Sequence, residues 1–290
     1  MRKLLLAGVG AAVLAVAPAR AADLPAAPVV APVVAPAPWS WTGFYVGGNA
    51  GYSWGNSDAT GNVALALFVN GVPFNGLALN TPQSGGGTNS VNGWLGGGQA
   101  GFNWQTGPLV LGVEADFQSA DQLGSNAFCT NGATACPAGP FAPGTAPFML
   151  NVAEKLVWFG TARARAGFGG DRFLFYVTGG AAAGKINADH MSSGTLFFAP
   201  PIVADSTSFT KRGWVVGGGV EASLIDNWTA KVEYLYMDLG TFSDTLVATG
   251  TQAGATSTVT TSFTSRLTDS IVRVGVNYKF WWADPVVARY

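Results

Sequence analysis

Charged residues are scarce in this chain of 290 residues: 15 Lys and Arg with 16 Asp and Glu amount to 11% of it. The chain also holds a single histidine and only two cysteines. Binding to nucleic acid requires a basic face, and a chain with no excess of basic residues does not provide one. We therefore exclude nucleic acid as a partner.

Long apolar runs are absent after the first 21 residues. The chain begins with two basic residues, an apolar run from Leu4 to Ala17 and an A-x-A site at 19–21, which predicts a signal peptide over 1–21. Cleavage after Ala21 leaves 12 basic and 16 acidic residues, a net charge of −4. No later apolar run reaches about 18 residues, so an exported chain of this kind enters a membrane only as a closed barrel.

Eight segments alternate between an apolar and a polar face with a period of two, which is typical of β-strands. In the first segment Phe44 and Val46 share one face, whereas Tyr45 and Asn49 share the other. No central position on the apolar faces is charged. The eight predicted strands cover residues 44–54, 94–104, 109–118, 156–168, 173–184, 214–224, 228–237 and 271–280.

Aromatic residues gather at the ends of the apolar faces. Trp and Tyr prefer the headgroup depth of a membrane, so two aromatic rims indicate the edges of a hydrocarbon layer. The eight apolar faces are therefore expected to contact lipid. The rim residues are Phe44, Trp54, Trp94, Trp104, Trp158, Phe168, Trp214, Trp228, Tyr278 and Phe280.

The connections alternate between short and long. Turns are predicted at 105–108, 169–172 and 225–227, the last with Asn227 in a left-handed conformation. Long loops are predicted near 55–92, 119–154, 186–211 and 239–269. This indicates an all-β, eight-stranded, antiparallel, up-and-down transmembrane barrel with short periplasmic turns and long extracellular loops. The apolar run at 63–69 leaves open an additional hairpin and a wider lumen.

The inward faces carry acidic and basic residues on neighbouring strands. The turns place Glu221 opposite Lys231, Gly97 opposite Asp116 and Gln99 opposite Glu114. In the narrow lumen of an eight-stranded barrel, paired charges form a salt-bridged plug, whereas exchanging pairs would form a gate or constriction. The predicted charge network comprises Glu114, Asp116, Arg163, Arg165, Glu221, Lys231, Glu233 and Arg273.

Other candidates for chemistry carry little support. Residues 96–101 match G-x-G-x-x-G but lie within a predicted strand rather than before a helix. His190, near Ser192 and Ser193, could serve an enzyme or contact haem, but it is read as a solvated loop residue. We predict no enzyme and no cofactor. Cys129 and Cys136 predict a disulfide rather than a metal site.

The ends of the chain are predicted to lie outside the barrel, which is assigned to 41–282. Residues 22–40 are rich in Pro and Ala and are expected to form an extended periplasmic linker. Tyr278 and Phe280 are the candidate assembly signal at the end of the last strand, and Tyr290 at the end of the chain is the alternative. Residues 283–290 are a C-terminal extension, in which Pro285 argues against further strand.

Four segments resemble a known family: WTGFYVGGNAGYSWG, WFGTARARAGF, LFYVTGGAAAGK and IVRVGVNYKF. They are similar to outer membrane immunogenic or opacity-type porin-family proteins, which implies an OmpA-type barrel in the outer membrane of a Gram-negative bacterium. The resemblance implies an antigenic surface protein involved in envelope integrity or host contact, and no catalytic residues.

The functional hypothesis is a structural surface protein, with a small diffusion channel and a lipid A-modifying enzyme as alternatives. Expected partners are outer-membrane lipid and lipopolysaccharide, the barrel assembly machinery and any extracellular ligand of the loops. The oligomeric state stays open.

Overall fold

The computed structural model describes residues 39–74, 83–130, 149–193, 202–252 and 254–280 of the chain. The chain divides into two compact units, Met1–Ala37 and Pro38–Tyr290. The predicted signal peptide, most of the predicted linker and the predicted C-terminal extension lie outside the described residues. In the described part of the chain, no helix is both long and apolar enough to cross a membrane.

The described residues form nine strands, and every pairing among them is antiparallel. Eight strands are 21 to 27 residues long, whereas β2 has two residues. Their bounds are β1 Gly43–Val69, β2 Val72–Pro73, β3 Gln83–Thr106, β4 Leu109–Cys129, β5 Met149–Gly169, β6 Phe173–Ser193, β7 Ile202–Ser223, β8 Trp228–Gln252 and β9 Ala255–Lys279.

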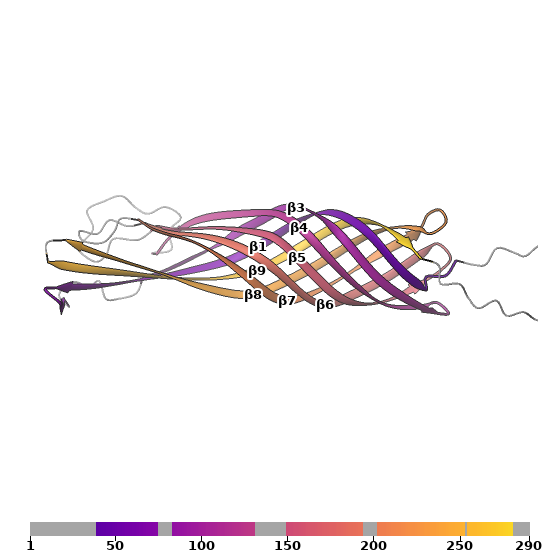
Figure 1. Ribbon diagram of the computed structural model, residues 1–290, viewed down its shortest axis with the longest axis horizontal. Helices are drawn as coiled ribbons and strands as arrows, with labels where there is room; N and C mark the ends of the chain where they lie inside the picture. Colours follow the sequence, from indigo (N-terminus) through magenta and orange to yellow (C-terminus); the bar gives the residue numbers. More distant parts are fainter. Residues whose placement is uncertain (1–38, 75–82, 131–148, 194–201, 253, 281–290) are drawn as a thin grey trace, which may run out of the picture. The chain divides into compact units, whose positions relative to one another are not determined.

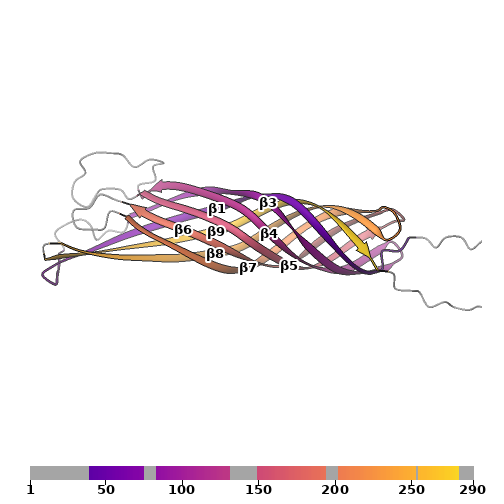
Figure 2. The same cartoon turned by 45° about the horizontal axis from the view of Figure 1, so that its top comes forward.

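The sheet closes on itself. Its order is β2-β1-β3-β4-β5-β6-β7-β8-β9, and β1 also pairs with β9 from Tyr45–Lys279 to Val69–Ala255 (Figures 1 and 2). The eight long strands thus form a ring of neighbours in chain order, with β2 attached to β1 as a short hairpin. The predicted all-β, up-and-down, antiparallel fold is confirmed.

The strands run far beyond the predicted segments, so the prediction of four long loops was largely wrong. A tilted strand needs about 9–11 residues to cross a membrane, which is less than half the length of β1. The Ser- and Thr-rich composition of these segments suggested loops, but Ser and Thr also occur in strands. The two-residue alternation of buried and exposed residues continues through these segments. In the run at 63–69, Val63, Leu65 and Leu67 point inward and are buried. This run extends β1 and adds no strand to the ring.

The two ends of the barrel differ. The turn end carries the three short turns, whereas the opposite, extended end carries the far parts of β1, β8 and β9 (Figure 1). Between them the outer face is apolar: Trp94 is 73% exposed and Phe168 is 69% exposed. This is the lipid-facing band that the aromatic rims predict.

Side chains fill the interior in layers. Trp41, Val110, Leu174 and Tyr176 form a cluster toward the turn end. A larger cluster built around Leu156, Phe159, Ile186, Leu235 and Met237 occupies the middle of the barrel. A third cluster includes Val63, Phe128, Leu150 and Phe263 and lies in the extended part.

Two turns differ from the prediction. The turn after β3 contains only Gly107 and Pro108, because Gly107 adopts φ 58° and Thr106 pairs with Leu109. Gln99 therefore pairs with Asp116, and the predicted partners Gly97 and Gln99 were each placed two residues off.

In the turn after β7, the left-handed residue is Asp226, with φ 51°, and not Asn227. Asp tolerates this conformation for the same reason as Asn, because its short polar side chain bonds locally. The register around this turn is as predicted, with Glu221 opposite Lys231.

Candidate functional site: the charged lumen

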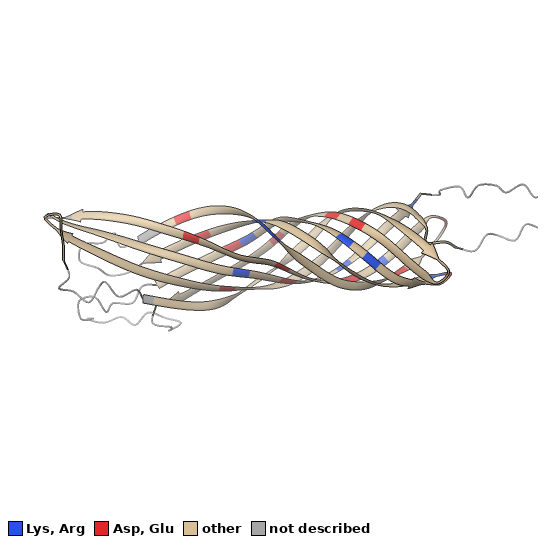
Figure 3. Cartoon of the chain, turned by 90° about the horizontal axis from the view of Figure 1, so that it is seen from below, with Lys and Arg blue, Asp and Glu red and all other residues tan. Residues whose placement is uncertain are grey.

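The eight charged residues predicted to point inward all do so. They come from β4, β5, β7, β8 and β9, and none of them is more than 7% exposed. Four are acidic and four are basic, so their formal charges cancel. In Figure 3 acidic and basic positions lie close together on neighbouring strands in the half of the barrel nearer the short turns.

Glu114 is the centre of the network. Lys231 Nζ lies 2.8 Å from both carboxylate oxygens, and Arg163 donates to Oε1. Tyr45 donates its hydroxyl to Oε2 at 2.7 Å, and Arg165 is 3.5 Å from the same oxygen. A single carboxylate on β4 therefore organises groups from β1, β5 and β8.

Arg163 and Arg273 connect opposite walls of the barrel. Arg163 lies 2.9 Å from Asp116 and 2.9 Å from Glu233, and Arg273 lies 3.0 Å and 2.6 Å from the same two carboxylates. Pairing of adjacent strands was predictable, since Glu114 is opposite Arg163 and Glu233 is opposite Arg273. The ion pairs that cross the lumen could not be predicted, because they form only when β1 pairs with β9 and closes the ring of strands.

Arg165 forms a lower layer with Glu221, 3.1 Å away. Its guanidinium lies between two aromatic rings, 4.9 Å from the ring centres of both Tyr45 and Tyr176. Cation–π contacts of this kind add to the attraction that Glu221 exerts on the guanidinium. The sequence placed both tyrosines inward but gave no sign that they would hold one arginine between them.

Neutral polar groups complete this layer, and the sequence had assigned inward positions to only two of them, Asn49 and Gln99. Asn277 and Thr229 donate to Glu221 at 2.9 Å and 2.5 Å. Gln99 donates to Asn277 at 2.5 Å and accepts from Asn49 at 2.9 Å. The two-residue period of each strand could have identified them, because each of these residues lies on the same face of its strand as the charged residues.

Apolar groups close the network off on both sides. Toward the turn end, Trp41 is 1% exposed and donates its indole N–H to the backbone oxygen of Gly170 at 2.8 Å. Trp39 packs edge-on against Trp41, with ring centres 5.8 Å apart, and Lys279 Nζ lies 4.1 Å above the Trp39 ring. On the other side lies the central cluster around Phe159 and Met237. The charge network thus lies between two apolar clusters.

The prediction that His190 is a solvated loop residue was wrong. His190 lies in β6, is 2% exposed and stacks on Phe263, with ring centres 4.4 Å apart. Its Nδ1 is 3.3 Å from Asp244 Oδ2. The side chains of His190 and Ser192 face inward, yet neither His190 Nε2 nor Ser192 Oγ has a hydrogen-bond partner. A carboxylate therefore orients the histidine, but no nucleophile is bonded to it.

The remaining predicted residues are placed as follows. Cys129 ends β4 and is fully buried, whereas Cys136 lies outside the described residues, so their disulfide stays a prediction. Tyr278 packs between Trp228 and Phe280, 5.2 Å from each ring. Phe280 donates its backbone N–H to Phe44 at the seam of the barrel. Across the described ranges, no three His, Cys, Asp or Glu residues are grouped to hold a metal.

Known proteins resemble this chain over nearly all its length. The model of the outer membrane protein beta-barrel domain matches residues 9–280. The 31 kDa outer-membrane immunogenic protein of Brucella melitensis biotype 1 is 35% identical over 97% of this chain and 100% of its own. The 25 kDa outer-membrane immunogenic protein of Brucella abortus biovar 1 is 28% identical over 87% of this chain and 85% of its own.

Solved structures of similar architecture include Neisserial surface protein A, at 14% identity and a TM-score of 0.31 over 79% of this chain and 97% of that one. The family match spans the ring from β1 to β9, and the 31 kDa relative aligns along its whole length. The chain therefore belongs to the outer membrane protein β-barrel domain family, among immunogenic surface proteins of the Gram-negative outer membrane.

Proposed function

We propose that this protein is a closed, structural barrel that anchors an extracellular β-extension and serves envelope integrity or surface contact. The observation that carries the proposal is the filled lumen: a neutral network of eight charges lies between apolar clusters on both sides. Function then resides in the outer face and in the extended end, not in transport through the centre.

The central cluster is the stronger barrier to ions. A hydrated ion would have to shed water to pass between Leu156, Phe159 and Leu235, all of which are fully buried. Hydrophobic constrictions block conduction by excluding water, even where the backbone leaves room. The charge network adds a second barrier, because moving one partner leaves another charge unpaired at a cost of several kcal/mol.

Planar-bilayer conductance of the refolded mature chain, residues 22–290, tests the proposal. We expect silence or rare, small events, because both barriers span the lumen. Heat-dependent mobility on gels provides the control that the barrel has folded. Steady, large steps from folded protein would contradict the closed lumen and identify a porin.

A small diffusion channel is the second candidate, and the charge network is the observation that favours it. Arg273 Nη1 has no hydrogen-bond partner among the described residues, which is unusual for a buried guanidinium and would suit exchange between partners. Under this hypothesis Arg163→Gln or Glu233→Gln opens the barrel. Under ours, neither variant conducts.

An enzymatic role rests on His190 and Asp244 alone. The relatives are named as immunogenic outer-membrane proteins, and none of those names describes an enzyme. We propose that His190 is structural, since it stacks on Phe263 inside the barrel. Mass spectrometry of lipid A from cells with and without the protein tests this: modification that disappears with His190→Ala would establish catalysis.

A barrel of the outer-membrane family contacts outer-membrane lipid. The assembly machinery and an extracellular ligand are further partners that we propose. We propose that the barrel assembly machinery reads Tyr278 and Phe280, which end the last strand and close the seam. Any extracellular ligand would meet the extended end of the barrel.

A further inference from the structure

Three outward-facing basic side chains lie together near the aromatic rim at the extended side of the lipid-facing band. Lys155, Lys185 and Arg212 come from the adjacent strands β5, β6 and β7. Lys185 is directly opposite Trp158. The other two pair with β6 residues two positions from Lys185, which puts their Cα atoms about 7–8 Å from it. One anionic group could contact all three side chains.

Two of these cations are unpaired. Lys155 is 2.6 Å from Asp121, an exposed pair that contributes little by itself. Within the described part of the chain, no carboxylate lies within 4.0 Å of Lys185 or Arg212. Arg266 on β9 differs, because it is held by Asp238 at 2.6 Å. Lys185 and Arg212 are therefore two unpaired cations on adjacent strands.

The depth of this basic patch indicates what it meets. Trp158 and Trp214 belong to the aromatic rim, and such rims lie at the level of lipid headgroups. Lys185 pairs with Trp158, and Arg212 precedes Trp214 by two residues on the same outward face. Basic residues at this depth attract the phosphate of anionic lipids.

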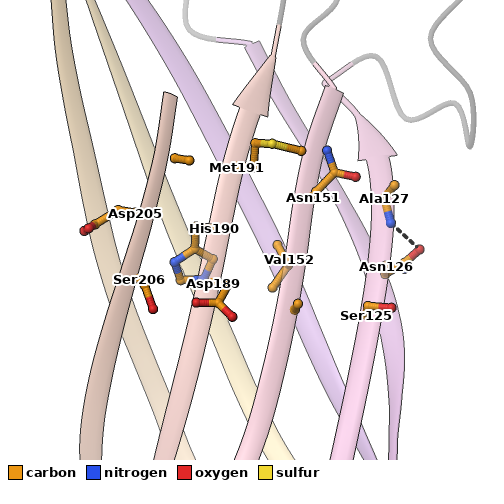
Figure 4. A pocket seen from close by; sticks show the side chains of 12 residues that line it. Ser125, Asn126, Ala127, Asn151, Val152, Asp189, His190, Met191, Asp205 and Ser206 are labelled. Carbon is orange, nitrogen blue, oxygen red and sulfur yellow. Dashed lines mark hydrogen bonds between the residues drawn. The ribbon is translucent and has the colours of Figure 1, made fainter. Parts of the chain in front are cut away.

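A hollow of about 960 Å³ lies farther along the same strands, toward the extended end. Outward side chains from β4 to β7 line it, among them Ser125, Asn151, Asp189 and Ser206 (Figure 4). Asp189 is four residues beyond Lys185, or about 13 Å along the strand. Hydroxyl, amide and carboxylate groups beside the apolar Met191 suit a sugar ring, which has polar edges and an apolar face.

We propose that the outer face of β4–β7 binds a phosphorylated glycolipid of the outer leaflet. Its phosphate is held by Lys155, Lys185 and Arg212, and its saccharide lies in the hollow above them. The proposal rests on the orientation in the proposed function, with the extended end outside the cell. It does not rest on the closed lumen, so conductance through the barrel leaves it unaffected.

The test is titration of folded, full-length mature protein in detergent micelles with lipopolysaccharide, with intrinsic Trp fluorescence as the readout. Lys185→Gln with Arg212→Gln removes the two unpaired charges, and at about 1 kcal/mol for each we expect binding to weaken about 30-fold. Arg172→Gln is the control, since it removes one exposed positive charge from a turn at the other end of the barrel. Equal affinity of the double variant and the control variant would overturn the proposal.

Two further arms separate the phosphate from the sugar. Dephosphorylated lipopolysaccharide should bind the wild type as weakly as intact lipopolysaccharide binds the double variant. Ala153 also lines the hollow. Ala153→Phe fills it, and this variant should weaken binding of lipopolysaccharide severalfold without changing binding of phosphatidylglycerol. If Ala153→Phe has no effect and the double variant loses both lipids equally, the patch attracts any anionic lipid and the glycolipid site is wrong.

Discussion

At the scale of residues, the protein surrounds each charge of the lumen network with partners of opposite sign. Arg163 has Glu114, Asp116 and Glu233 as partners, and Arg165 has Glu221 and two tyrosine rings. A buried ion pair adds little net stability over apolar residues of similar size, but loss of one partner is costly. The network therefore specifies one arrangement of the lumen more than it adds stability.

Glu114→Gln is expected to destabilise the folded barrel by about 3–5 kcal/mol, because Lys231, Arg163 and Tyr45 lose their shared acceptor charge. Urea unfolding in detergent, followed by Trp fluorescence, measures the change. Asp121→Asn is the matched control: its carboxylate is 72% exposed, and its loss should cost less than about 1 kcal/mol. Equal effects of the two variants would mean that the network is not structural.

At the scale of elements, glycine on the inward face lets the strands curve tightly. A Cβ at Gly97 would overlap the backbone oxygen of Phe117 on β4, whereas a Cβ at Gly98 would be 3.8 Å from the nearest atom. The G-x-G-x-x-G sequence at 96–101 is thus a structural feature of β3, as its position within a strand predicts.

Gly97→Ala should lower the free energy of unfolding by about 1–3 kcal/mol, because β3 and β4 must move apart to admit the methyl group. Gly98→Ala faces lipid and should be close to neutral. Urea midpoints of the two variants provide the comparison. If Gly98→Ala is the more harmful of the two, the assignment of inward and outward faces in β3 is wrong.

The extended parts of the strands give a second prediction at this scale. Backbone amides of residues 255–266 pair with β8 on one side and β1 on the other, so they should resist hydrogen exchange. Exchange measured by mass spectrometry should show protection comparable to that of residues 271–279. Complete exchange of 255–266 within seconds would restore the interpretation of this segment as a loop.

At the scale of the whole molecule, the closed barrel that we propose has two barriers in series: the charge network and the central apolar cluster. Removing either one leaves the other in place, so neither a charge variant nor a cluster variant should conduct alone. This arrangement distinguishes a structural plug from a gate, because a gate opens when its single constriction is released.

Combining Arg163→Gln with Phe159→Ser and Met237→Ser should produce conductance that neither set of substitutions produces alone. Phe159 and Met237 are fully buried in the central cluster, and serine admits water where they stood. Planar bilayers measure the steps, and gel mobility of each variant verifies folding. Conductance from Arg163→Gln alone would favour the channel.

Local sequence patterns specified the short-range features of this protein. Strand periodicity gave the inward and outward faces, the aromatic rims and the eight inward charges, because these depend on neighbours one to three residues apart. Turn composition placed Glu221 opposite Lys231. The predicted pairing of β3 with β4 was wrong by two residues. A two-residue turn with Gly107 left-handed and a four-residue turn have similar local energies, so composition alone could not choose between them.

The contacts across the lumen and the full length of the strands depend on how the ring of strands closes. Arg163 of β5 reaches Glu233 of β8, and Trp41 closes the turn end, because ring closure brings these groups together from distant parts of the chain. His190 is buried because β6, β8 and β9 enclose it well beyond the lipid-facing band. Ser- and Thr-rich segments suit loops and strands alike, and only pairing with neighbouring strands settles which one forms.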